Sequence, residues 1–375
     1  MPAALRLSLL VLLGLACARA PSLPPNSSDA PEVREASEWP AYGGDPGGLR
    51  YVPLEEITPA NVAGLEIAWS YRHGDGSERD SGRGISSFQA TPILVDGVLY
   101  FPTPFNRVIA LDPATGAEHW SYDPGLDPEE DFFLLTSRGV SFWRDAVAPA
   151  DAACARRIFT ATRDAFLIAL DAGTGKPCVG FGADGRVDLA PGAGELLFRG
   201  EYGVTSAPEI VNDRVVVGAF VADNVRVDAP SGVVRAFDAR TGELSWAWDL
   251  APPGYDYETR PVTSHGYALG TPNVWAPMSS DAERDLVFVP TGNPSPDLYR
   301  GGDRSDMDHY GSSIVALRAS TGEVVWRFQT VHHDLWDYDV PAQPTLFELE
   351  RDGERIPALV QGTKMGFLFV LHRET

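Results

Sequence analysis

The chain has 375 residues, of which 44% are hydrophobic, and a formal net charge of −22. This length accommodates two ordinary domains or one large all-β body. The excess of acidic residues argues against binding to nucleic acid or to an anionic membrane surface, since both require Lys and Arg. The 37 glycines and 31 prolines favour many turns and few long helices.

Residues 1–20 are typical of a secretory signal peptide. Arg6 precedes an apolar run, and a small-residue cleavage site follows. Cys17 follows "LGLA", a loose match to a lipoprotein cleavage box, so lipid anchoring through Cys17 is the alternative to plain secretion. We therefore expect a periplasmic protein with no transmembrane segment beyond the signal peptide. Residues 21–38 are rich in Pro, Ser and acids and are expected to form a disordered leader.

The rest of the chain contains four copies of one pattern. Each copy has an apolar run, a Thr-Gly turn and a second run that ends in an aromatic residue, which is typical of strand, tight turn and strand. The copies are residues 108–122, 167–181, 234–248 and 314–328. Further hairpins are predicted between them, as in "ATPILVDGVLYFPT" at 90–103. A repeat of this kind predicts an all-β propeller, whereas the alternative, a β-sandwich, does not explain the repetition.

Three tryptophans occupy the same place in these copies, namely Trp120, Trp246 and Trp326. A large aromatic residue at one fixed position of each unit is predicted to pack between neighbouring blades. We therefore assign these three residues a structural role and no chemistry.

Cys154 and Cys178 are the two cysteines beyond the signal peptide. Export makes a disulfide between them plausible, and two buried thiols are the alternative. Cys and His residues do not cluster at zinc-ligand spacing, so a zinc site is not predicted.

Several polar and aromatic residues are not required by the repeat. Each has a structural explanation as a turn residue or a surface ion pair. As a set they provide oxygen ligands for a hard cation such as Ca²⁺, an aromatic platform and two cations for an anionic ligand. The set comprises Arg138, Asp223, Asn224, Trp275, Asn293, Asp334, Asp337, Asp339 and Lys364. The stretch "VHHDLWDYDVPAQP" at 331–344 is by itself compatible with a metal site, a catalytic acid or base, or a polar loop.

Three motifs make the chain similar to a known family. They are "RGVSFW" at 138–143, "TVHHDLWDYDVPAQPTL" at 330–346 and "TKMGFLFVL" at 363–371. The chain resembles the quinoprotein dehydrogenases that use pyrroloquinoline quinone (PQQ), above all the membrane-type glucose dehydrogenases. The resemblance implies an eight-bladed β-propeller with PQQ and a divalent ion, Ca²⁺ or Mg²⁺, on its axis. Residues 39–375 would then form the N-terminal part of this propeller, with about half of the blades.

The resemblance also implies roles for individual residues. Asp337 matches the catalytic base, and Lys364 matches the basic residue beside the reactive carbonyls. The implied PQQ contacts are Gln89, Arg138, Thr205, Trp275 and Lys364. The implied metal ligands are Asp223, Asn224, Asn293 and Asp337.

The implied activity is oxidation of the hydroxyl group of a sugar, polyol or alcohol, by hydride transfer to the quinone with Asp337 as base. The resemblance leaves a quinone and a cytochrome c as alternative electron acceptors. A rival of another class is a propeller lipoprotein with PQQ-like repeats that acts as an envelope scaffold, but such a scaffold has no use for Arg138, Trp275, Asp337 and Lys364. The chain holds four complete repeats and the start of another, so we expect it to be a fragment that is inactive alone.

Overall fold

The computed structural model describes residues 38–75, 85–127, 130, 132–298 and 306–375. The predicted signal peptide, Cys17 and the leader up to residue 37 lie outside the described residues. Residues 36–375 form one compact unit. Over the described ranges, no helix combines the length and the apolar character needed to cross a bilayer.

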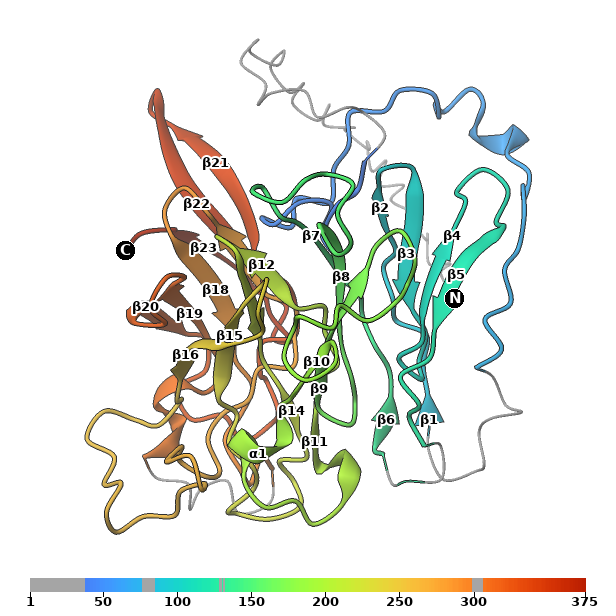
Figure 1. Ribbon diagram of the computed structural model, residues 1–375. Coiled ribbons are helices and arrows are strands. Elements are labelled where there is room, and N and C mark those ends of the chain that lie inside the picture. Colours follow the sequence, from blue (N-terminus) through green and yellow to red (C-terminus); the bar gives the residue numbers. More distant parts are fainter. Residues whose placement is uncertain (1–37, 76–84, 128–129, 131, 299–305) are drawn as a thin grey trace, which may run out of the picture. The chain divides into compact units, whose positions relative to one another are not determined.

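Five antiparallel sheets follow one another along the chain (Figure 1). The first contains β2 (Ile93–Val95), β3 (Val98–Pro102), β4 (Val108–Leu111) and β5 (Glu118–Tyr122). The second contains β7 (Ser141–Arg144), β8 (Arg156–Ala161), β9 (Phe166–Asp171) and β10 (Arg186–Asp188). The third contains β12 (Glu209–Val211), β13 (Arg214–Val217), β15 (Val234–Asp238) and β16 (Leu244–Trp248).

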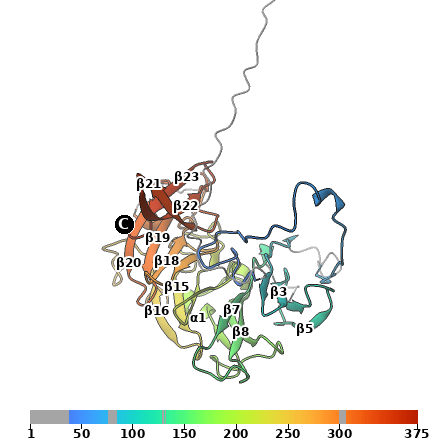
Figure 2. The same cartoon turned by 90° about the horizontal axis from the view of Figure 1, so that it is seen from above.

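The fourth sheet contains β17 (Ser279–Asp281), β18 (Leu286–Pro290), β19 (Ser313–Arg318) and β20 (Val324–Gln329). The fifth has three strands, β21 (Thr345–Arg351), β22 (Glu354–Gly362) and β23 (Leu368–His372). Figure 2 shows the sheets side by side in chain order, as blades of a propeller are. The predicted all-β propeller architecture is therefore confirmed.

Short elements connect these sheets. β1 (Ile85–Ser86) pairs in parallel with β6 (Leu134–Leu135), and β11 (Tyr202–Gly203) pairs antiparallel with β14 (Phe220–Val221). The helical segments of the described residues are α1 (Ala190–Ala193) and the 3₁₀ turns Val62–Gly64, Arg199–Glu201 and Met307–Tyr310.

The repeated Thr-Gly turn has a local explanation. The Asp112 carboxylate accepts hydrogen bonds from the backbone N–H of Thr115, at 2.7 Å, and from its hydroxyl group, also at 2.7 Å. Gly116 follows with a φ of 70°, which glycine adopts without steric cost. Asp171 accepts the same pair of bonds from Thr174 in the next repeat. The turn thus forms from residues within five positions of one another, which is why the sequence pattern identifies it.

The three repeated tryptophans join the first sheet to the second, the third to the fourth and the fourth to the fifth. The Nε1 atom of Trp120 donates to the carbonyl oxygen of Ala172 at 3.0 Å, and that of Trp246 donates to Ala319 at 2.8 Å. The Nε1 atom of Trp326 donates to the carbonyl oxygen of Arg373 at 2.7 Å. The predicted packing of these tryptophans between blades is confirmed.

Trp69 makes the same contact, although the sequence comparison did not include it. Its Nε1 atom donates to the carbonyl oxygen of Pro113 at 3.1 Å. A Cβ atom at Gly116, in the Thr-Gly turn, would lie 2.6 Å from the Trp69 ring, as one at Gly175 would lie 2.5 Å from Trp120. "LEIAWSY" at 65–71 therefore corresponds to the last run of the repeat.

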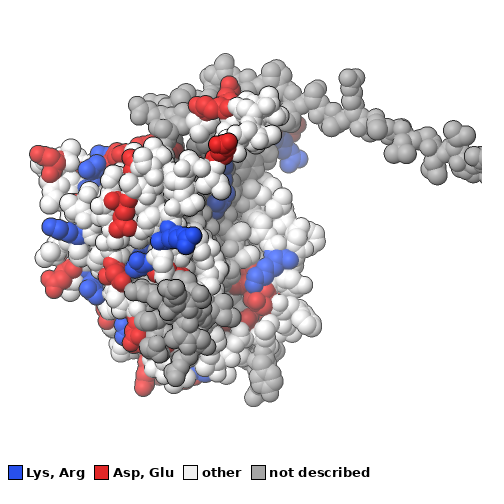
Figure 3. All heavy atoms as spheres, turned by 90° about the vertical axis from the view of Figure 1, so that its right-hand side faces the viewer, with Lys and Arg blue, Asp and Glu red and all other residues white. Residues whose placement is uncertain are grey.

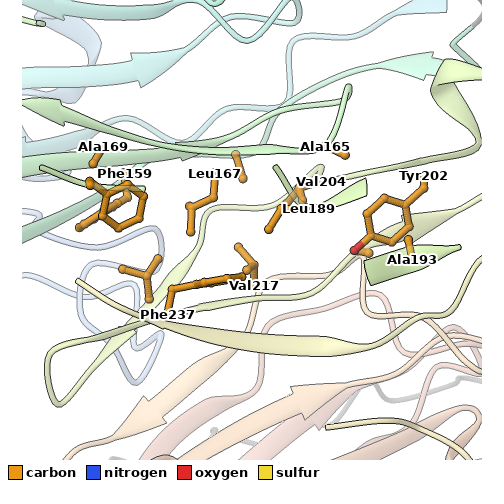
Figure 4. Packing of buried hydrophobic residues seen from close by; sticks show 14 of the residues in the cluster. Phe159, Ala165, Leu167, Ala169, Leu189, Ala193, Tyr202, Val204, Val217 and Phe237 are labelled. Atoms are coloured by element: carbon orange, nitrogen blue, oxygen red, sulfur yellow. The ribbon is translucent and has the colours of Figure 1, made fainter. Parts of the chain in front are cut away.

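Apolar clusters fill the spaces between consecutive sheets. Figure 4 shows Phe159 and Leu167 of the second sheet facing Val217 and Phe237 of the third. All four side chains are buried and belong to one apolar cluster between the second and third sheets. The predicted disulfide is also confirmed: Cys154 and Cys178 are bonded, with their Cα atoms 5.8 Å apart.

Candidate active site

Loops from the second to the fifth sheet converge on one cavity of about 260 Å³. They precede the first strands of these sheets, follow β14, or connect strands within one sheet, so residues far apart in sequence meet there. The described residues that line it are Leu134, Thr136, Arg138, Arg163, Thr205, Phe220, Val221, Asp223, Asn224, Trp275, Asp297, Asp337, Asp339 and Lys364. Figure 3 shows the side of the molecule that lies to the right in Figure 1; where its atoms are described, acidic and basic side chains are interspersed and form no basic patch.

Seven of the nine predicted site residues line this cavity, and two do not. Gln89 is exposed, and its amide nitrogen donates to the Ser87 hydroxyl at 3.4 Å. Asn293 is buried behind the wall, where its amide nitrogen donates to Asp297 at 2.7 Å. Asn293 therefore contacts Asp297, which lines the cavity, but does not line the cavity itself. Gln89 lies outside the cavity.

Trp275 lies in the cavity wall and is held there by contacts with three other residues. Its indole N–H donates to Asp339 Oδ2 at 2.6 Å, which fixes the plane of the ring. The guanidinium carbon of Arg138 lies 4.9 Å from the ring centroid, within the range of a cation–π contact. Thr205 donates its hydroxyl hydrogen to the carbonyl oxygen of Trp275 at 3.1 Å. These contacts orient an aromatic face and a cation toward the same space.

Lys364 lies between two carboxylates. Its Nζ atom is 3.0 Å from Asp337 Oδ1 and also pairs with Asp339 Oδ1. Burial alone would lower the pKa of Lys364, but its hydrogen bonds and charge interactions with Asp339 and Asp337 raise it. Burial raises the pKa of Asp339, while Lys364 and the Trp275 indole oppose that shift. Lys364 is therefore a protonated, positively charged group at neutral pH.

A second acidic group lies deeper. Asp223 accepts a hydrogen bond from the Asn273 amide at 2.9 Å, and Asp297 accepts one from Asn224 at 3.3 Å. Burial, and then the negative charge of Asp297, raise the pKa of Asp223 to about 8. Carboxylates that repel one another in this way are stabilised by a bound cation.

The side chains around Asp223 supply only part of the ligand set that a hard divalent cation requires. Carboxylate and amide oxygens are the ligands that Ca²⁺ and Mg²⁺ prefer, and Asp223 and Asn224 supply both kinds at the cavity wall. Over the described ranges, however, no three side chains among His, Cys, Asp and Glu gather in a metal-binding cluster. The Asn293 oxygen already accepts from the Ser312 hydroxyl at 2.8 Å.

Three polar residues of the wall, Thr136, Arg163 and Asp297, were not predicted, and Asp339 was predicted as a member of the polar set without an individual role. Asp339 and Asp297 bond to predicted residues, whereas Arg163 and Thr136 come from other loops. Asp339 stands two positions after Asp337 in one polar stretch, so only its contact with Trp275 distinguishes it from a loop residue. Arg163 lies in the turn between β8 and β9 and has no motif around it.

Fold and site together define a propeller with a ligand cavity at its blade loops. Residues 39–375 match the family model described as the glucose/ethanol/alcohol dehydrogenase β-propeller domain (PQQ). The chain therefore belongs to this family, and the predicted resemblance is confirmed.

Particular relatives are also similar over most of the chain. Quinoprotein glucose dehydrogenase A of Acinetobacter calcoaceticus is 39% identical over 364 residues, which cover 93% of this chain and 45% of that protein. The quinoprotein glucose dehydrogenase of Escherichia coli is 41% identical over 340 residues, which cover 90% and 42%. The glycerol dehydrogenase large subunit of Gluconobacter oxydans is 39% identical over 354 residues, which cover 94% and 47%. The chain thus spans less than half the length of these relatives.

A solved structure has the same fold over this range. The quinohemoprotein alcohol dehydrogenase of Comamonas testosteroni superposes with a TM-score of 0.73 at 29% identity, over 92% of this chain and 48% of that one.

Proposed function

We propose that this chain is part of a PQQ-dependent dehydrogenase that oxidises the hydroxyl group of a sugar, polyol or alcohol. The observation that carries the proposal is the convergence of Arg138, Trp275, Asp337 and Lys364 on one cavity of about 260 Å³. Membership in the family supports the cofactor and the class of reaction.

Trp275 and Arg138 are the residues that would hold the cofactor. PQQ is flat and carries three carboxyl groups; when bound, it supplies a quinone that accepts hydride. The indole face suits stacking against such a ring, and the guanidinium group suits pairing with a carboxylate. The bond from Trp275 to Asp339 keeps the indole plane in place before the ligand arrives.

Asp337 is the proposed general base. Its side chain is 45% exposed, so a substrate hydroxyl group has access to the carboxylate, which would take the hydroxyl proton. Lys364, 3.0 Å from Asp337, would place a positive charge beside the reactive carbonyl oxygens of the quinone, on which negative charge develops.

Asp223 and Asn224 would hold a Ca²⁺ or Mg²⁺ ion, with Asn293 supporting them from behind through Asp297. Such an ion polarises a bound oxygen as a Lewis acid. The ion would also oppose the two effects that raise the pKa of Asp223, burial first and then the negative charge of Asp297.

The proposal extends to the organisation of the chain. Residues 1–20 would direct export to the periplasm, with lipid attachment at Cys17 as the alternative, and residues 21–38 would be a leader. Residues 39–375 would form the N-terminal part of the PQQ-binding propeller. The electron acceptor is either a quinone or a cytochrome c.

Reconstitution tests this function. The whole enzyme of which this chain is part is purified and incubated with PQQ and Ca²⁺, and cofactor binding is measured by quenching of tryptophan fluorescence. Dye-linked assays on aldoses, polyols and primary alcohols then define the substrate class. Saturable PQQ binding that Trp275→Ala weakens at least 10-fold is expected, because stacking on an aromatic ring is lost. Absence of binding at micromolar PQQ, with the protein folded by circular dichroism, would refute the proposal.

A further inference from the structure

Arg163 is a buried cation in the wall of the cavity. It lies in the turn between β8 and β9, and its side chain is 0% exposed. Its Nε atom donates to the carbonyl oxygen of Leu134 at 3.1 Å, and Nη2 donates to that of Gly200 at 3.3 Å. Nη1 has no hydrogen-bond partner within the part of the chain that the structure describes. One donor of the guanidinium group is therefore available to a ligand.

Among the described residues, no carboxylate pairs with Arg163. The described partners of its guanidinium group are two carbonyl oxygens and the aromatic rings of Phe220 and Phe132, whose centroids lie 4.3 Å and 6.0 Å from the guanidinium carbon. Burial, and then the like charge of Arg138, lower the pKa of Arg163 to about 9. A buried charge without a counter-charge destabilises the folded state.

Other buried arginines of this chain are compensated or lie elsewhere. Arg373 donates to Asp281 at 2.8 Å and pairs with Glu348. Arg235 resembles Arg163 in having uncharged acceptors, the carbonyl oxygen of Leu189 and the hydroxyl group of Tyr202, each at 2.8 Å. Arg235, however, does not line the cavity. Arg163 thus combines an uncompensated charge, a free donor and a position in the ligand cavity.

We infer that Arg163 binds an anionic group of the ligand in this cavity, beside Arg138, and that this group is a carboxylate of a flat aromatic ligand. The inference rests on the proposed function, in which that ligand is PQQ. Two planar guanidinium groups match carboxylates in shape and charge, and the Trp275 and Phe220 rings offer apolar surface to an aromatic body. The acids of the cavity, Asp223, Asp297, Asp337 and Asp339, would repel a carboxylate, so the two arginines define where it binds.

The test compares PQQ with its trimethyl ester, which has the same ring system without the negative charges. Dissociation constants for both are measured with the purified protein in the presence of Ca²⁺, for wild type and Arg163→Gln. We expect the variant to weaken PQQ binding about 10–100-fold, the usual range for a lost charge-assisted hydrogen bond. Binding of the ester should change less than threefold. Arg163→Lys, which keeps the charge, should recover most of the affinity for PQQ.

Arg235→Gln is the matched control, because it removes a buried arginine with uncharged partners that lies outside the cavity. It should leave the ratio of the two dissociation constants unchanged. Equal weakening of PQQ and ester in Arg163→Gln would overturn the inference and show a structural role. If Arg163→Gln does not fold, Arg163→Lys alone tests the inference. Equal weakening of PQQ binding and ester binding in Arg163→Lys would contradict it. A wild type that binds the ester but not PQQ also contradicts it, whereas a wild type that binds neither refutes the proposed function itself.

Discussion

Asp337 lies in the left-handed region of backbone space, with a φ of 59°, and its carboxylate is 3.0 Å from the Lys364 ammonium group. Asp and Asn adopt this conformation more readily than other residues with a side chain. Asp337→Asn therefore keeps the backbone and the shape of the side chain, and removes the basic carboxylate.

We predict that Asp337→Asn, in the whole enzyme of which this chain is part, lowers turnover by about 10²–10⁴ while PQQ binding changes little, because losing a general base has an effect of this size. Steady-state dye reduction and fluorescence titration measure the two quantities separately. Asp352→Asn is the control: this residue also has a positive φ, of 55°, but lies in the exposed turn between β21 and β22. Near-normal turnover in Asp337→Asn, with cofactor bound, would exclude Asp337 as the base.

Glu209 is a titratable residue outside the candidate site. It lines a second cavity, of about 160 Å³, and accepts a hydrogen bond from the Ser280 hydroxyl at 2.6 Å. Burial raises the pKa of Glu209 to about 8, an effect that Ser280 opposes and the charge of Asp45 reinforces. The folded protein therefore holds a proton that the unfolded chain releases at about pH 4.3.

This difference predicts how stability depends on pH. The contribution of Glu209 to the free energy of unfolding is fully present below the unfolded pKa and is lost as pH rises toward the folded pKa of about 8. Glu209→Gln does not titrate, so the variant should gain about 3–4 kcal/mol relative to wild type between pH 5 and pH 8. Urea denaturation at both pH values measures this change. A difference between variant and wild type that stays constant over this range would contradict the raised pKa.

At the scale of the element, a tryptophan packs on a Thr-Gly turn of the next sheet at Gly116, Gly175 and Gly322. A Cβ atom at Gly322 would lie 2.6 Å from the Trp246 ring, at a φ of 77°. Gly353 has a similar φ of 83°, but a Cβ atom there would meet nothing within 4 Å. The two glycines thus separate the cost of backbone conformation from the cost of disturbing the blade interface.

Gly353→Ala is expected to destabilise the protein by about 1–2 kcal/mol, the cost of a left-handed residue with a side chain. Gly322→Ala should lose about 1–3 kcal/mol more, because the added methyl group displaces Trp246 from its bond to Ala319. Thermal denaturation of both variants, followed by tryptophan fluorescence, measures the difference. Equal losses would show that the glycine is required for the turn and not for the packing of the blades.

At the scale of the whole molecule, the fifth sheet differs from the other four. It has three strands, and the outer strand β23 exposes Leu368 at 74% and Val370 at 51%. The run "LEIAWSY" at 65–71 exposes Ile67 at 85% beside Trp69, which packs as the last run of a blade does. Apolar strands with an unpaired edge tend to associate.

We predict that residues 39–375 alone associate at micromolar concentration and do not turn over substrate. Sedimentation velocity at several concentrations and dye reduction with PQQ and Ca²⁺ test both statements. Leu368→Lys combined with Val370→Lys should shift the distribution toward monomer, because charges on an edge strand oppose pairing. Lysines at Glu350 and Glu354, exposed positions of β21 and β22, serve as control. A compact monomer with one cooperative melt and measurable turnover would contradict this prediction.

The order of the blades could be inferred from the sequence because its causes are local. The turn at Asp112, Thr115 and Gly116 closes within five residues, and the aromatic residue that ends each repeat follows a few positions later. Most of the site residues were predicted in another way, from motifs shared with a family. Seven of those nine residues line the cavity.

Only the tertiary structure determined which polar residues meet. Asp339 differs from its neighbours in sequence only by the bond that it accepts from Trp275, 64 positions away. Asn293 and Gln89 have ordinary surroundings in the sequence, yet one is buried behind Asp297 and the other is exposed. Arg163 has no motif, and its uncompensated charge is evident only where the turn from the second sheet meets Leu134, Gly200 and Phe220. Blade loops converge because successive sheets pack face to face, and this packing depends on contacts between residues distant in sequence, which no local pattern records.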